Sequence, residues 1–105
     1  MIFTSLDAVA PPSAEGAVLD VGEVATQVSL QVSSPDAATA QLEVSLDGVN
    51  WFYGPTAASN GGMVSMDIPF RWTRAKSLFP NPYPYTTPTF GPVTAKIAVP
   101  VKKDN

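Results

Sequence analysis

Asp47 and Asn50 offer side-chain oxygens within a short segment, residues 45–52 with the sequence SLDGVNWF. Carboxylate and amide oxygens are ligands that Ca²⁺ accepts, so the pair raises the question of a calcium site. Such a site needs about six to eight oxygens, and this segment holds no second carboxylate. The dipeptide Asp47-Gly48 is instead typical of a hairpin turn, because glycine accepts a positive φ at no steric cost. We therefore expect Asp47 to be a turn residue and the protein to bind no metal.

Arg71 and Arg74 lie in the segment RWTRA, residues 71–75. Two guanidinium groups at this spacing could clamp a phosphate or a carboxylate of a ligand. Arginine at the rim of a sheet more often pairs with an acidic side chain of its own chain. We favour the ion pair, and we keep both arginines as candidate contacts to a partner.

Trp51 and Trp72 allow two interpretations. A tryptophan face can stack on a sugar ring, and the same ring can anchor a hydrophobic core by burying about 200 Å². Trp51 directly follows the expected hairpin, and Trp72 sits in the middle of an expected strand. We expect both rings to belong to the core.

The residue types needed for most catalysis are absent. The chain contains no cysteine and no histidine, which excludes disulfides, thiolate or imidazole metal sites, cysteine nucleophiles and Ser-His triads. The nine acidic side chains are spread singly along the sequence, and no lysine lies in an apolar run that would depress its pKa. We expect a protein that is not an enzyme and that uses no cofactor.

Aromatic residues gather in a proline-rich segment, residues 80–92 (PNPYPYTTPTFGP). Prolines lower the cost of ordering a segment on binding, and the rings of Tyr83, Tyr85 and Phe90 offer contact area with few rotatable bonds. These residues, with Ile2 and Phe3 near the N-terminus, are the predicted apolar contacts to a partner. The alternative is that the segment folds back over an edge of the domain.

Strand patterns fit the chain, whereas eleven prolines and seven glycines interrupt almost every helix pattern. Apolar and polar residues alternate clearly in residues 27–33 and 40–46. Further strands are expected at 17–20, 51–53, 63–68, 71–78 and 93–101, with a small-residue loop at 54–62. This pattern predicts an all-β protein, a single antiparallel sandwich of seven to eight short strands of jelly-roll or galactose-binding type.

The length of 105 residues suits one domain. We expect residues 1–15 to form an N-terminal arm and linker, and residues 16–105 to form the sandwich with its proline- and tyrosine-rich loop. Residues 2–6 could also pair with another strand. No basic N-terminal region or long apolar stretch indicates a signal peptide or a membrane helix.

Charges are segregated along the sequence. Residues 1–50 carry seven acidic and no basic side chains, whereas residues 51–105 carry two acidic and six basic ones. A solvated surface explains this, and so does complementarity between an acidic patch of one copy and a basic patch of its neighbour. Six scattered bases on a chain of net charge −3 argue against nucleic acid as a partner.

The segment SLDGVNW (residues 45–51), followed by the strand RWTRA (residues 71–75), resembles the discoidin-like, galactose-binding-type β-sandwich. It is similar to small sandwich proteins encoded in the structural modules of tailed phages. The chain is shorter than extracellular discoidin domains and lacks the cysteines that often join their termini. The phage type is therefore the closer resemblance.

This resemblance implies a virion protein without enzymatic activity, assembled in the host cytoplasm. The expected role is a capsid decoration or accessory protein that binds the major capsid protein, copies of itself, or both. Two alternatives are a carbohydrate-binding module and an accessory protein of the tail or baseplate. The step from the sandwich to the capsid rests on analogy between folds.

Overall fold

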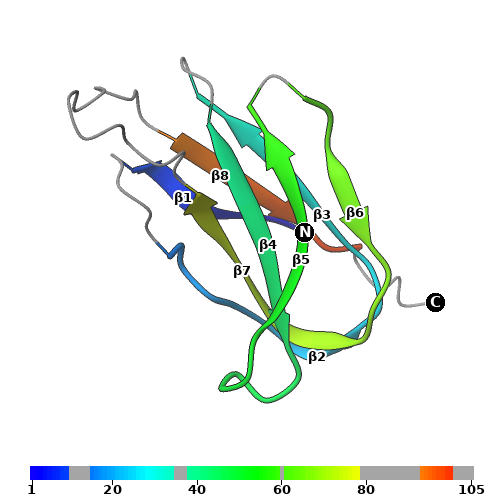
Figure 1. Cartoon of the computed structure of the whole chain (residues 1–105). Coiled ribbons are helices and arrows are strands. Elements are labelled where there is room, and N and C mark those ends of the chain that lie inside the picture. The colour runs from blue at the N-terminus through cyan, green and yellow to red at the C-terminus, as the bar shows by residue number, and fades with distance from the viewer. Residues whose placement is uncertain (10–14, 35–37, 60, 79–92, 101–105) are drawn as a thin grey trace.

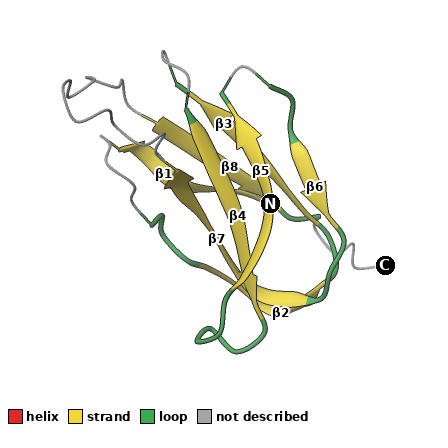
Figure 2. Cartoon of the chain, viewed as in Figure 1, coloured by secondary structure: helices red, strands yellow, loops and turns green. Residues whose placement is uncertain are grey.

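A computed structural model describes residues 1–9, 15–34, 38–59, 61–78 and 93–100. These residues contain no helix and form eight strands (Figures 1 and 2). In chain order the strands are β1 (Ile2–Val9), β2 (Leu19–Ala25), β3 (Val28–Ser33), β4 (Thr39–Ser45), β5 (Phe52–Ala58), β6 (Val64–Met66), β7 (Phe70–Leu78) and β8 (Val93–Ala98).

The strands form two four-stranded antiparallel sheets that face each other. Sheet I has the order β1-β8-β3-β6, and sheet II has the order β2-β7-β4-β5. Every connection crosses between the sheets except the β4–β5 hairpin, and this strand order is that of a jelly roll. The predicted all-β antiparallel sandwich is confirmed.

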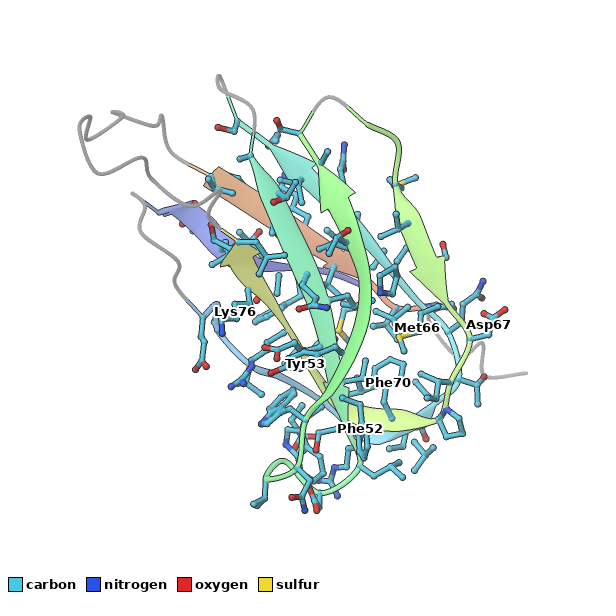
Figure 3. All side chains as sticks on the ribbon, viewed as in Figure 1. Phe52, Tyr53, Met66, Asp67, Phe70 and Lys76 are labelled. Atoms are coloured by element: carbon cyan, nitrogen blue, oxygen red, sulfur yellow. The ribbon has the colours of Figure 1, made fainter. Side chains whose placement is uncertain are left out.

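The core lies between the sheets and is built from alternating positions. In β3 the apolar side chains of Val28, Leu30 and Val32 are buried, whereas the polar residues between them are partly or fully exposed. Phe70, at the start of β7, is the largest fully buried side chain (Figure 3). The remaining apolar core residues come from both sheets: Leu6, Ala40, Leu42, Val44, Ala57, Ala75, Val93, Ala95, Ile97 and Val99.

Residues 2–9 form a strand and not an arm, which corrects the expectation for this part of residues 1–15 and agrees with the alternative that residues 2–6 pair with another strand. Residues 2–9 form the edge strand β1, paired with β8 from Ile2 opposite Ala98 to Val9 opposite Val93. Leu6 of this strand is fully buried. The sequence IFTSLDAV fits a strand because a bulge between Thr4 and Leu6 turns Leu6 inward without strict alternation.

A close contact near Gly16 ties β1 to sheet II. The Ser5 hydroxyl donates to the Ala17 carbonyl and accepts a hydrogen bond from the Ala75 amide of β7. The Gly16 amide donates to the Ala75 carbonyl. A Cβ atom on Gly16 would lie 2.6 Å from the Ser5 carbonyl oxygen and 2.8 Å from that of Ala75. Glycine is therefore required at this junction.

Strand β5 is longer than expected and removes most of the small-residue loop predicted at residues 54–62. It pairs with β4 as far as Ala58 opposite Thr39, and Ala57 is buried. A Cβ atom at Gly54 would lie 3.1 Å from the Leu42 carbonyl oxygen, so the small residue lets the strands approach closely. Small side chains here indicate tight packing.

Candidate functional site

The outer face of sheet II carries the charged and aromatic side chains that the sequence singled out. In β7, Thr73, Ala75 and Ser77 are buried, so the residues between them, Arg74 and Lys76, point away from the core. Figure 3 shows Lys76 and Tyr53 on this side of the molecule. Two clusters form on this face, each centred on one arginine.

Arg74 is held by two carboxylates and a ring. Its Nε donates to Oε1 of Glu43 at 2.9 Å, and its Nη1 lies 3.4 Å from Oε2 of Glu15. The guanidinium carbon is 4.1 Å from the centroid of the Trp51 ring, a cation–π contact. The side chain of Glu43 is only 3% exposed. The sheet surface thus contains a buried carboxylate whose charge Arg74 balances.

Arg71 forms the second cluster, in an exposed setting. Its Nε and Nη2 donate to the two carboxylate oxygens of Asp20 at 2.9 and 3.2 Å. Its guanidinium carbon lies 4.5 Å from the Trp72 ring centroid. The hydrogen bond from Arg71 lowers the pKa of Asp20, and the same bond raises the pKa of Arg71. Both arginines therefore pair with acids of their own chain, as favoured from the sequence.

Asp47 is confirmed as a turn residue. Its Oδ1 accepts hydrogen bonds from the amides of Val49 and Asn50, each at 2.8 Å, and its Oδ2 accepts from Nδ2 of Asn50 at 2.8 Å. Gly48 has a φ of 77°. These donors hold the pKa of Asp47 well below its usual range, the Asn50 amide contributing most. Within the described residues no group of three or more acidic side chains is placed to hold a metal ion.

Neither tryptophan belongs to the core, which corrects the expectation for both. Trp51 and Trp72 are partly buried on the outer face of sheet II, each beneath an arginine. Trp72 also packs on the turn, since a Cβ atom at Gly48 would lie 3.4 Å from its ring. Phe70 occupies the interior instead. Alternation counted back from the buried Thr73 places Trp72 on the outer face. Phe70 departs from this alternation, because it is buried although it lies three positions before Thr73.

The predicted apolar contacts are distributed unevenly. Ile2 is exposed on β1, whereas Phe3 is partly buried and pairs with the core residue Ile97, whose face of the sheet it shares. Phe3 is therefore a structural residue more than a contact. Tyr83, Tyr85 and Phe90 lie outside the described residues, and their role stays a prediction.

Sequence reasoning missed an exposed apolar group at the β4–β5 end of the sandwich. Leu46, Val49 and Phe52 are 56%, 78% and 61% exposed, and the neighbouring Tyr53 is 69% exposed on the opposite side of β5. The run WFY at residues 51–53 carried a usable signal. Side chains of a strand alternate between faces, so three successive aromatic residues cannot all be buried.

Comparisons with known proteins show the fold. A scan against protein-family models and a search of curated proteins found no match. Among solved structures, the chain is similar to the SPBc2 prophage-derived protein YomS, with a TM-score of 0.65 and 13% sequence identity. The likeness covers 94% of this chain and 90% of that one, so it extends over the whole sandwich.

The described part of the chain has no helix with the length and hydropathy needed to cross a membrane. Its charged groups on sheet II are largely paired with one another, and Leu46, Val49, Phe52 and Tyr53 form an exposed apolar group at the β4–β5 end. Such an arrangement is suited to contact with another molecule, since ion pairs fix the surface and apolar side chains supply contact area.

Proposed function

We propose that this chain is a non-enzymatic structural protein of a tailed phage that decorates the capsid as an accessory protein. The observation that carries the proposal is the likeness in fold, over nearly the full length of both chains, to a prophage-derived protein. Jelly rolls recur in viral capsid proteins, which supports the same direction by analogy.

Binding would follow from the surface just described. Rim ion pairs contribute only about 0–1 kcal/mol each, so apolar contacts have to hold the complex. The exposed side chains of Leu46, Val49 and Phe52 offer such contacts in place of the N-terminal arm. Ile2 and the aromatic residues Tyr83, Tyr85 and Phe90 remain candidates for the same task.

The copy number of the protein in purified particles of the phage that encodes it tests this proposal. Quantitative mass spectrometry should find the chain at a level comparable to that of the major capsid protein. A few copies per particle would instead favour the tail or baseplate alternative. Absence from the particles would refute a virion role.

A carbohydrate-binding module is the second candidate, because Trp51 lies outside the core on an outer face. Trp51 lies beside the Arg74–Glu43 pair on an outer face, and Tyr53 pairs with Glu43 across the strands. Rings that flank charged hydrogen-bonding groups are suited to stacking on a sugar. A glycan array should then give signals that Trp51→Ala and Tyr53→Ala abolish, and an array without signal removes this candidate.

A further inference from the structure

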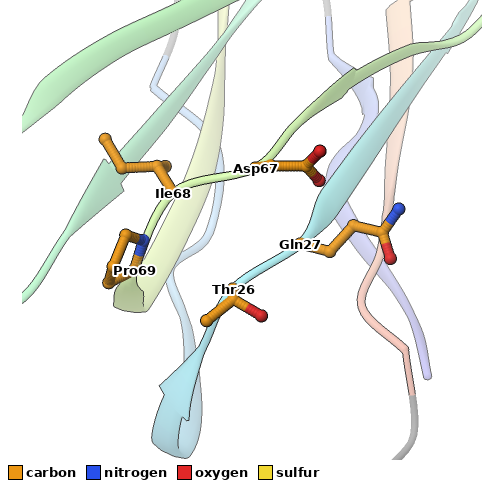
Figure 4. Close-up of a pocket in the computed structure, with 5 residues that line it drawn as sticks. All are labelled: Thr26, Gln27, Asp67, Ile68 and Pro69. Atoms are coloured by element: carbon orange, nitrogen blue, oxygen red, sulfur yellow. The ribbon is translucent and has the colours of Figure 1, made fainter.

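Three adjoining hollows run across the lower end of the sandwich, where the β2–β3 and β6–β7 connections meet. The central hollow lies between Thr26 and Gln27 on one connection and Asp67, Ile68 and Pro69 on the other (Figure 4). A second hollow shares Ile68 and Pro69 with it, and a third shares Thr26 and Gln27. The three hollows adjoin through these shared residues, and together they are called the groove.

The hollow nearest the β4–β5 hairpin is the most apolar part of this groove. It has a volume of about 250 Å³ and is lined by Val44, Ser45, Leu46, Phe52, Ile68 and Pro69. Phe52 is in register with the core residue Val44, so it stands on the inner side of β5. Most of its ring is nevertheless exposed at the rim of the hollow. An exposed apolar hollow rimmed by polar residues is a candidate binding groove.

The charge around this surface is acidic. Asp47 lies in the hairpin beside Leu46, and the exposed Asp67 lines the neighbouring hollow. Arg71 follows Pro69 by two residues in the sequence, and Asp20 already engages it through two hydrogen bonds. A partner that covers the apolar hollow therefore has to bring its own positive charge.

A second copy of the chain does not satisfy this requirement by two-fold pairing. A two-fold interface places the same patch of both copies face to face, so it would bring the acidic side chains of one copy toward those of the other. Like charges across an interface suppress association. The patch is thus complementary to a basic surface and not to itself.

We propose that the apolar–acidic end, formed by Leu46, Asp47, Phe52, Asp67, Ile68 and Pro69, docks a protein surface that presents an apolar side chain flanked by lysine or arginine. The proposal rests on the proposed function, which makes that partner a shell protein of the same particle. The apolar side chain would enter the hollow beside Phe52. The flanking bases would lie near Asp47 and Asp67 and make the binding sensitive to salt.

Particles assembled without this protein provide the test, by adding back purified variants and measuring occupancy against concentration. Phe52→Ser should weaken binding at least about tenfold, because it removes an apolar contact at the centre of the surface. Met63→Ser is the matched control, since Met63 is a similarly exposed apolar residue that lines none of the three hollows. This control should bind like the wild type. Asp67→Lys should weaken binding at low salt and lessen its dependence on salt.

The melting temperatures of the variants are measured first. Because the substituted residues are exposed, these temperatures should stay near the wild-type value. If the wild type binds and Phe52→Ser binds equally well, the proposal of this docking surface is overturned and the virion role stays intact. Wild-type protein that fails to bind any particle would overturn the proposed function and this inference with it. Concentration-dependent self-association lost in Phe52→Ser would identify a second copy as the occupant and refute the basic partner.

Discussion

The guanidinium of Arg74 lies between the ring of Trp51, 4.1 Å from its centroid, and the carboxylate of Glu43, 2.9 Å from its nearest oxygen. Arg74 thereby neutralises an almost fully buried charge on the outer face of a sheet, where an exposed carboxylate would need no partner. The indole makes contact with the guanidinium and lowers its access to water. Glu43, Arg74 and Trp51 are therefore energetically coupled.

Replacing Arg74 with methionine should destabilise the fold by about 3–5 kcal/mol, because Glu43 is left buried without its counter-charge. Urea denaturation at neutral pH measures the change in the free energy of unfolding. The double variant Glu43→Gln/Arg74→Met removes both charges and should recover most of this loss. Equal destabilisation in the single and double variants would show that the loss does not come from an uncompensated charge on Glu43.

Phe70→Ala should cost about 3–5 kcal/mol, because it empties the position of the largest fully buried side chain. Trp51→Ala should cost clearly less, since its larger ring lies partly exposed outside the core. Thermal and urea unfolding of the two variants give the comparison. A greater loss for Trp51→Ala would restore the tryptophan to the role of core anchor.

Most of the fold was accessible from the sequence because strand periodicity reports directly which residues face inward. Residues 27–33 and 40–46 correspond closely to β3 and β4, and Asp47-Gly48 marks the hairpin between β4 and β5. Strand β1 was harder to predict because its bulge interrupts the alternation. Without a clear alternation, an edge strand and an extended arm look alike in the sequence.

The candidate sites were less accessible, because they depend on which strands are neighbours. Glu43 and Arg74 are opposite each other only because β4 pairs with β7 in one particular register. No sequence pattern supplies a register between strands thirty residues apart. Phe52 differs, since the run WFY could have indicated that one of these aromatic residues is exposed, although not which end of the sandwich carries it.

Gly16→Ala should destabilise the protein by about 1–3 kcal/mol, because its new methyl group meets the backbone of Ser5 and Ala75. The loss should appear as faster hydrogen exchange of the Ala17 amide, which donates to Ser5 of β1. Gly62→Ala is the control, since a Cβ atom there has no heavy atom within 4 Å. If both variants keep wild-type stability, the junction between β1 and sheet II tolerates a side chain.

Asp47→Asn should reduce the stability of the protein at neutral pH, and the deficit should shrink in acid. The amides of Asn50 and Val49 favour the charged carboxylate, so its pKa is lower in the folded than in the unfolded chain. A group with a lowered folded pKa stabilises the fold above its unfolded value, 3.8 for this carboxyl, and that stabilisation fades as the pH falls through the lower folded value. Urea unfolding of the wild type and the variant from pH 6 down to about pH 2 measures the difference between them. A difference that stays constant over this range would mean that the turn does not depend on the charge of Asp47.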